Sequence, residues 1–130
     1  MSTLTLTNVT KTYGDGPEAV TALDDVTVRV AAGEFVALVG PSGSGKTTFL
    51  AIAGALLQPT RGQVLLDDRD ISTLPPAALT RFRLDHIGFV LQSSNLVPYL
   101  TTRDQLLLVA RLAGKLDRAA SGSAWRSPAR

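Results

Sequence analysis

Hydrophobic and polar residues alternate in two stretches near the N-terminus, at residues 4–9 and 26–30. A two-residue period is typical of a strand with one buried face, so both stretches predict half-buried strands that pair antiparallel. A different pattern follows at residues 35–39, FVALV, where no polar position interrupts the apolar run. This run predicts a strand buried on both sides of a parallel sheet.

The rest of the chain mixes helical and extended patterns. Further elements are expected as a helix over 46–57, a short strand over 63–67, a helix over 75–84, a buried strand over 87–91 and a leucine-rich helix over 104–113. Thr102 and Gln105 have capping-box spacing before the last helix. The pattern predicts an α/β fold whose sheet is partly parallel.

Composition narrows the class of protein. A chain of 130 residues with 45% hydrophobic content can bury the core of one domain. It has no cysteine, which excludes disulfides and thiolate metal sites. The net charge is only +2, without a clustered basic stripe, which argues against a nucleic-acid partner. We see no signal peptide or membrane segment and expect a cytoplasmic location.

One motif carries chemistry. The sequence GPSGSGKT at residues 40–47 fits the phosphate-binding pattern G-x-x-x-x-G-K-[ST], between a predicted strand and a predicted helix. Glycines let successive backbone N–H groups point at one anion, and the helix N-terminus faces the same place. Lys46 is expected to reach the β- and γ-phosphates, and Thr47 to ligate Mg²⁺. The flanking elements disfavour a simple glycine-rich turn with a surface lysine.

Two other candidates are weaker. An apolar run ending at Asp67 and Asp68 imitates a strand with a magnesium-directed aspartate. It comes soon after the phosphate-binding motif and precedes turn residues, so a peripheral hairpin fits better. His86 is the single histidine and has no evident metal partner, so we interpret it as a surface or boundary residue.

Residues 4–113 resemble the nucleotide-binding subunit of ABC transporters. VTKTYGDG is similar to the A-loop of that family, GPSGSGKTT to its Walker A motif, GQVLLDDRDISTL to its antiparallel β-subdomain and IGFVLQSSNLVPYLTTRDQL to its Q-loop. The sequence around the Q-loop, FVLQSSNLVPYLT, is most similar to that of the branch that serves lipoprotein-release and macrolide-export permeases. The resemblance implies an α/β P-loop NTPase core of the ABC type with an N-terminal antiparallel β-subdomain.

The resemblance also implies a site and partners. ATP and Mg²⁺ would be the cofactors, with Tyr13 stacking on adenine. Gln92 would meet Mg²⁺ and the attacking water, Thr47 would ligate Mg²⁺ and Lys46 would contact the phosphates, so that Lys46 and Gln92 would contribute to catalysis. The expected cofactor-binding residues are Tyr13, Gly40, Pro41, Ser42, Gly43, Ser44, Gly45, Lys46, Thr47 and Thr48. The implied partners are a membrane permease and a second ATP-binding subunit, which together would hold the chain on the inner face of the membrane.

The resemblance stops after the Q-loop. No signature motif, Walker B strand, D-loop or switch histidine follows. The catalytic base of the family is a glutamate downstream of these motifs, whereas both glutamates here, Glu18 and Glu34, precede Lys46. We therefore expect a partial ATP-binding domain over 1–118, truncated in its helical subdomain, and a low-complexity tail over 119–130 that is disordered or out of frame. Such a chain is expected to bind Mg-ATP weakly and to hydrolyse it inefficiently.

Two alternatives stay open. The chain could be a non-catalytic interaction fragment that docks on a permease or on a full-length partner. It could also be a small-molecule kinase of the guanylate-kinase type, which carries a similar glycine-rich loop. In those kinases the loop lies at the extreme N-terminus, whereas 39 residues precede Gly40 here.

Overall fold

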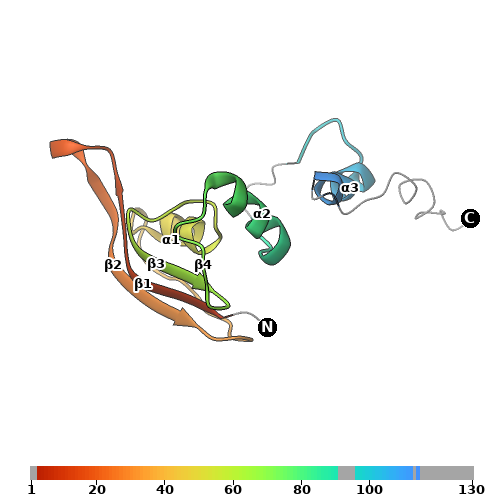
Figure 1. Cartoon of the computed structure of the whole chain (residues 1–130). Helices are drawn as coiled ribbons and strands as arrows, with labels where there is room; N and C mark the ends of the chain where they lie inside the picture. Colours follow the sequence, from red (N-terminus) through yellow and green to blue (C-terminus); the bar gives the residue numbers. More distant parts are fainter. Residues whose placement is uncertain (1–2, 91–95, 113, 115–130) are drawn as a thin grey trace, which may run out of the picture. The chain divides into compact units, whose positions relative to one another are not determined.

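The structure is a computed structural model that describes residues 3–90, 96–112 and 114. The chain divides into two compact units, residues 1–87 and residues 88–130, and each is described by itself. The first unit holds a curved sheet with α1 and α2 on its concave side (Figure 1). No helix in the described part of the chain is long and apolar enough to cross a membrane.

The sheet of the first unit has four strands in the order β2-β1-β3-β4, and all of its pairings are antiparallel. The strands are β1 (Leu4–Tyr13), β2 (Val20–Val30), β3 (Arg61–Leu66) and β4 (Arg69–Asp70), with a short 3-10 helix, η1 (Gly16–Glu18), between β1 and β2. The predicted antiparallel β-subdomain is thus confirmed. The alternating residues of the two N-terminal stretches pair with one another, Leu4 opposite Val30 and Leu6 opposite Val28.

Two helices cover the sheet, α1 (Lys46–Ala53) and α2 (Pro76–His86). Apolar side chains from sheet and helices form one buried core: Leu6, Val9, Leu23, Ile52, Ala55, Val64, Leu66, Ile71, Leu79 and Phe82. Ile52 of α1 is 1% exposed, so burial of this side chain holds the helix to the sheet. Arg83 of α2 donates a hydrogen bond to the carbonyl oxygen of Ala55, just beyond the end of α1, at 2.9 Å.

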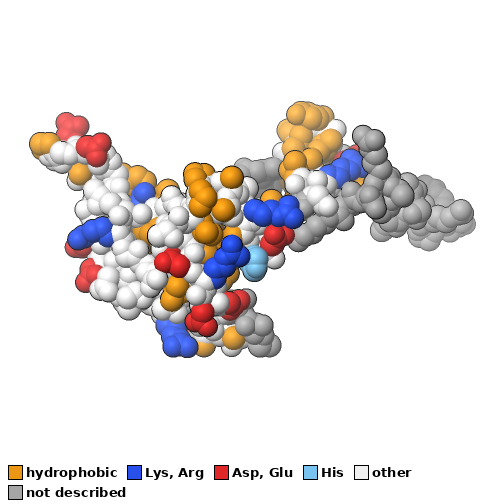
Figure 2. Space-filling model, in the orientation of Figure 1, with side chains coloured by type: hydrophobic (Ala, Val, Ile, Leu, Met, Phe, Trp, Pro, Cys, Tyr) orange, Lys and Arg blue, Asp and Glu red, His pale blue; other side chains and the backbone are white. Residues whose placement is uncertain are grey.

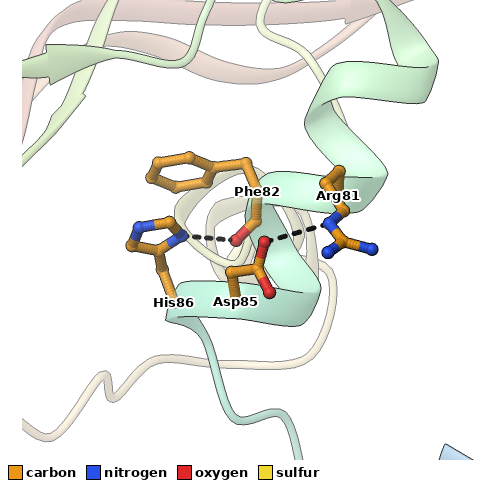
Figure 3. Close-up of polar contacts among 4 residues, drawn as sticks. All are labelled: Arg81, Phe82, Asp85 and His86. Carbon is orange, nitrogen blue, oxygen red and sulfur yellow. Dashed lines mark hydrogen bonds and ion pairs between the residues drawn. The ribbon is translucent and has the colours of Figure 1, made fainter. Parts of the chain in front are cut away.

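The last turn of α2 combines an aromatic stack with an ion pair (Figure 3). The rings of Phe82 and His86 are stacked with centroids 4.3 Å apart, and Nδ1 of His86 lies 2.9 Å from the carbonyl oxygen of Phe82. Arg81 and Asp85 are paired at 3.2 Å, one helical turn apart. His86 is therefore a boundary residue that closes the helix, as the sequence predicted.

The two apolar runs do not form the predicted strands. Residues 35–40 and 87–90 have no strand pairing, and Phe35, Val39 and Val90 are 95%, 85% and 96% exposed. A parallel strand gains its hydrogen bonds from neighbours on both sides, and the described residues supply none to these segments. Every strand pairing among the described residues is antiparallel, so the prediction of a partly parallel sheet is wrong there. Leu91, the last residue of the second predicted strand, lies outside the described residues.

Helix boundaries also differ from prediction, and α2 runs to His86 rather than to Leu84. α1 ends at Ala53, capped by Gly54, rather than at Leu57. In the second unit α3 (Thr102–Leu112) is capped by Thr101, not Thr102: the Thr101 hydroxyl accepts the N–H of Asp104 at 3.2 Å. The threonine pair gave two possible cap registers, and the carboxylate of Asp104, which accepts the Thr101 hydroxyl at 2.6 Å, favours the earlier one.

The hairpin between β3 and β4 turns at Asp67 and Asp68, both with positive φ (51° and 63°). Asp67 accepts the backbone N–H of Thr3 at 2.8 Å. Leu66, the last residue of β3 before this turn, pairs with Leu4 at the start of β1. The hairpin interpretation of these aspartates is confirmed.

Asp70 gives this hairpin a pH-dependent contact. The hydroxyl of Ser72, the amide of Gln63 and the backbone N–H of Ser72 all donate to its carboxylate, and they lower its pKa against the opposing effect of burial. A lowered pKa means that the stabilisation is present above the pKa of the unfolded chain and is lost as the pH falls through the folded value.

We therefore expect Asp70→Asn to lower the free energy of unfolding modestly at pH 7, with the difference from the unaltered chain disappearing in acid. Urea unfolding at several pH values measures this difference. Asp68→Asn is the matched control, because it removes an exposed carboxylate of the same hairpin. A deficit of Asp70→Asn that persists unchanged at low pH would contradict the assignment.

Candidate functional site

The phosphate-binding motif forms a loop that ends at the first turn of α1. Gly45 is the N-cap residue of α1, with φ 82° and ψ 2°, and its carbonyl oxygen accepts the N–H of Phe49 at 2.8 Å. Ser44 donates its N–H to the carbonyl oxygen of Pro41 at 3.3 Å, which curls the loop back on itself. The free N–H groups at the start of α1 therefore face the loop, where the positive end of a helix dipole favours an anion.

Lys46 points its ammonium group back across the loop. Its Nζ donates to the carbonyl oxygens of Gly40 and Pro41 at 2.8 and 2.6 Å and lies 3.3 Å from the hydroxyl of Ser44. The cation is thus held within reach of the loop backbone and of the N-terminus of α1. The Lys46 ammonium therefore lies at the loop that precedes α1, as the motif predicts.

At two glycines of the loop, Gly40 and Gly45, an added side chain would clash with a neighbouring atom. A Cβ at Gly45 would lie 2.3 Å from the carbonyl oxygen of Ala22 and 3.1 Å from the side chain of Leu23. A Cβ at Gly40 would meet the Ser44 hydroxyl at 2.8 Å. Gly43 has φ 79° but open space around it, so its requirement is conformational alone. Gly45 therefore fixes the loop against β2, and Gly43 allows it to turn.

Tyr13 lies beside the loop although it is 33 residues earlier than Lys46 in the sequence. It is the last residue of β1 and is 44% exposed. Its hydroxyl lies 3.4 Å from the Thr48 hydroxyl on α1. The structure thus brings the expected aromatic residue to the phosphate-binding motif.

The remaining predicted site residues are Pro41, Ser42, Thr47 and Gln92. Ser42 and Thr47 are exposed, and Pro41 lies at the start of the loop turn. Among the described residues, no group of three His, Asp or Glu side chains could hold a metal ion. A cation at the loop would take its oxygen ligands from the Thr47 hydroxyl and from bound phosphates. Gln92 lies outside the described residues.

A hollow of about 320 Å³ adjoins the loop. Its walls are Leu23, Val26, Val28, Leu38, Val39, Gly40, Pro41, Ser44, Gly45, Lys46 and Phe49. Most of these side chains are apolar and belong to β2 and to residues 38–41. Hydrophobic side chains also reach the surface elsewhere on the visible face of the molecule (Figure 2).

No motif or pattern in the sequence singles out Lys11. Its ammonium nitrogen lies 5.4 Å from the centre of the Tyr13 ring, a distance typical of a cation–π contact. The only available signal was the i, i+2 spacing of the two residues on a strand, which places both side chains on one face.

The chain is similar to several known proteins. A family profile described as "ABC transporter" matches residues 23–127. The ABC transporter ATP-binding protein MJ0796 of Methanocaldococcus jannaschii is 45% identical over 114 residues, covering 86% of this chain and 48% of that protein. The macrolide export ATP-binding/permease protein MacB of Marinobacter nauticus is 44% identical over 109 residues, covering 84% of this chain and 17% of that protein.

Solved structures agree with the sequence comparison. A dimeric structure of MJ0796, a bacterial ABC transporter cassette, superposes with a TM-score of 0.82 at 44% identity, covering 93% of this chain and 51% of that one. A second MJ0796 structure, in a post-hydrolysis state bound to ADP and Pi, gives a TM-score of 0.79 over 85% of this chain and 47% of that one. This chain spans about half the length of MJ0796 and of the putative hemin import ATP-binding protein HrtA of Staphylococcus haemolyticus, two of the curated relatives that it matches.

Proposed function

The chain belongs to the ABC transporter family as part of an ATP-binding domain, and from that premise we propose that residues 40–48, with Tyr13, bind Mg-ATP. The observation that carries the proposal is the convergence of the Lys46 ammonium, the loop backbone and the N-terminus of α1. These groups suit a polyphosphate, because the ammonium brings positive charge to the loop and the start of α1 brings N–H donors.

Each residue has a separate part in the proposed complex. Lys46 exchanges its bonds to the carbonyl oxygens of Gly40 and Pro41 for the β- and γ-phosphate oxygens. Backbone N–H groups at the start of α1 donate to the β-phosphate. The Thr47 hydroxyl suits Mg²⁺, since hard cations prefer oxygen ligands, and the cation would neutralise phosphate charge.

Tyr13 supplies the proposed base contact. Its ring is 44% exposed and its hydroxyl is held near Thr48, so a stacked adenine would lie directly beside the phosphate loop. The MJ0796 structure described as bound to ADP and Pi supports nucleotide binding by this chain, because the two are 44% identical over 85% of this chain.

Turnover needs groups that these 130 residues do not contain. No glutamate follows Lys46, and the motif set stops after the Q-loop. Phosphoryl transfer depends on positioned charge and an oriented nucleophile, so residues 1–130 by themselves are expected to hydrolyse ATP orders of magnitude more slowly than a domain that has these groups. We propose that this chain binds Mg-ATP without efficient hydrolysis, and that Gln92 contributes only when the rest of an ATP-binding domain is present.

The proposed partners are a membrane permease and a second ATP-binding subunit. The relative MacB is named an ATP-binding/permease protein, and the relative MJ0796 has a structure described as dimeric. The similarity of this chain to both proteins supports the proposed partners. The whole protein would then lie on the inner face of the membrane and couple nucleotide binding to transport.

Phosphate release tests the proposed lack of turnover. With saturating Mg-ATP, we expect a rate indistinguishable from that of buffer alone, while a fluorescent ATP analogue still binds and is displaced by ATP. The two readouts together separate binding from catalysis. Steady phosphate release that Lys46→Ala abolishes would show an active ATPase and overturn the proposal.

A further inference from the structure

Lys11 and Tyr13 form a pair at the end of β1 next to the phosphate loop. The two residues are two positions apart on one strand, and the Lys11 ammonium nitrogen lies 5.4 Å from the centre of the Tyr13 ring. An ammonium over an aromatic face is attracted by the negative charge of the π-system. One face of the Tyr13 ring is therefore covered by a cation that belongs to the same strand.

The Tyr13 ring is also held at its far end. The phenolic oxygen lies 3.4 Å from the Thr48 hydroxyl, and Thr48 is on the first turn of α1, two residues after Lys46. The ring thus has one contact on its face and one at its tip, from two different elements. Tyr13 is nevertheless 44% exposed, so part of the residue stays accessible to a ligand.

We propose that Lys11 is a positioning residue for nucleotide binding: it orients the Tyr13 ring and leaves one face open to the base. This inference rests on the proposed function, since it concerns the same nucleotide. Lys11 acts through Tyr13 and does not touch the phosphates. Loss of the ammonium lets the ring adopt other rotamers, so base stacking must then include the cost of ordering the side chain.

The test separates the base from the phosphates. Isothermal titration calorimetry with Mg-ATP and with Mg-tripolyphosphate compares a ligand that has a base with one that has only the phosphate chain. Lys11→Met is expected to weaken ATP binding about twofold to fivefold, the size of one exposed cation–π contact, and to leave tripolyphosphate binding unchanged.

Three variants control the interpretation. Lys11→Arg keeps a cation over the ring and is expected to restore ATP affinity. Arg29→Met removes the same charge from the exposed part of β2 and is expected to leave ATP affinity unchanged. In a Tyr13→Ala background, Lys11→Met is expected to have no further effect, because the contact it removes is already gone. Circular dichroism melts verify that each variant is folded.

The possible outcomes are distinct. Equal losses for ATP and tripolyphosphate would show that Lys11 acts on the phosphates and would overturn the inference. An unchanged ATP affinity in Lys11→Met would also overturn it while leaving the proposed function intact. Failure of the unaltered chain to bind ATP would contradict the proposed function itself and the inference with it.

Discussion

Gly45→Ala is expected to destabilise the first unit by about 2–6 kcal/mol, the sum of backbone strain at a positive φ and of overpacking. Gly45 has φ 82°, and the added Cβ would lie 2.3 Å from the carbonyl oxygen of Ala22. The atom it meets belongs to the backbone of β2, so no side-chain rotation can relieve the contact. A loss of this size is a large part of the net stability of an ordinary domain.

Urea unfolding followed by circular dichroism measures this loss, and Gly43→Ala is the matched control. Gly43 has nearly the same φ, 79°, in the same loop, but no atom lies within 4 Å of its added Cβ. It therefore reports conformational strain alone, on the order of 1 kcal/mol. Equal losses for the two variants would show that the contact between the loop and β2 does not exist in solution.

Lys46→Ala is expected to weaken Mg-ATP binding about tenfold to hundredfold, the equivalent of one strong charge-assisted hydrogen bond. The ammonium is the charged group that the structure places across the loop, within 2.8 Å of two of its carbonyl oxygens. The thermal stability of the variant should change little, because these bonds are close to solvent and water can replace them.

Calorimetric titration with Mg-ATP tests Lys46→Ala, with Arg29→Ala as a control for the loss of one positive charge. Arg29 lies on the exposed part of β2 and pairs with Thr5, away from the loop. Binding by Lys46→Ala that matches the unaltered chain would place the nucleotide elsewhere on the molecule.

The parts of the fold that depend on local pattern could be predicted from the sequence. The two alternating stretches became β1 and β2, and the Asp67–Asp68 dipeptide became the tight turn of a hairpin. Both cases follow from properties of neighbouring residues: a two-residue period and tolerance of positive φ. The helix after the glycine-rich loop was predicted for the same reason, although Gly54 ends it four residues early.

The apolar runs at 35–39 and 87–91 show where local pattern fails. A hydrophobic run indicates a preference for burial, but a strand forms only when another backbone pairs with it. Among the described residues no backbone pairs with 35–39 or with 87–90. Phe35, Val39 and Val90 are almost fully exposed, whereas Ile87 packs partly against the core.

The candidate site was predictable where a motif encodes it. The pattern at residues 40–47 by itself predicts the loop, the helix start and the place of Lys46. Tyr13 was found only through the resemblance to a family, because no local rule links it to a loop 27 residues later. Lys11 was missed, since its contact with the ring depends on the side-chain directions at the end of β1. The proposed role of Gln92 stays a prediction.

The central claim, that a nucleotide binds at the loop and at Tyr13, is tested most directly by locating the ligand. Backbone amide NMR spectra of the ¹⁵N-labelled chain, titrated with Mg-ATP, report which residues respond. We predict saturable shifts at Gly43, Gly45, Lys46 and Thr48 and at Tyr13, with the amides of the β3–β4 hairpin unchanged. Shifts confined to other residues, or none at saturating nucleotide, would contradict the account.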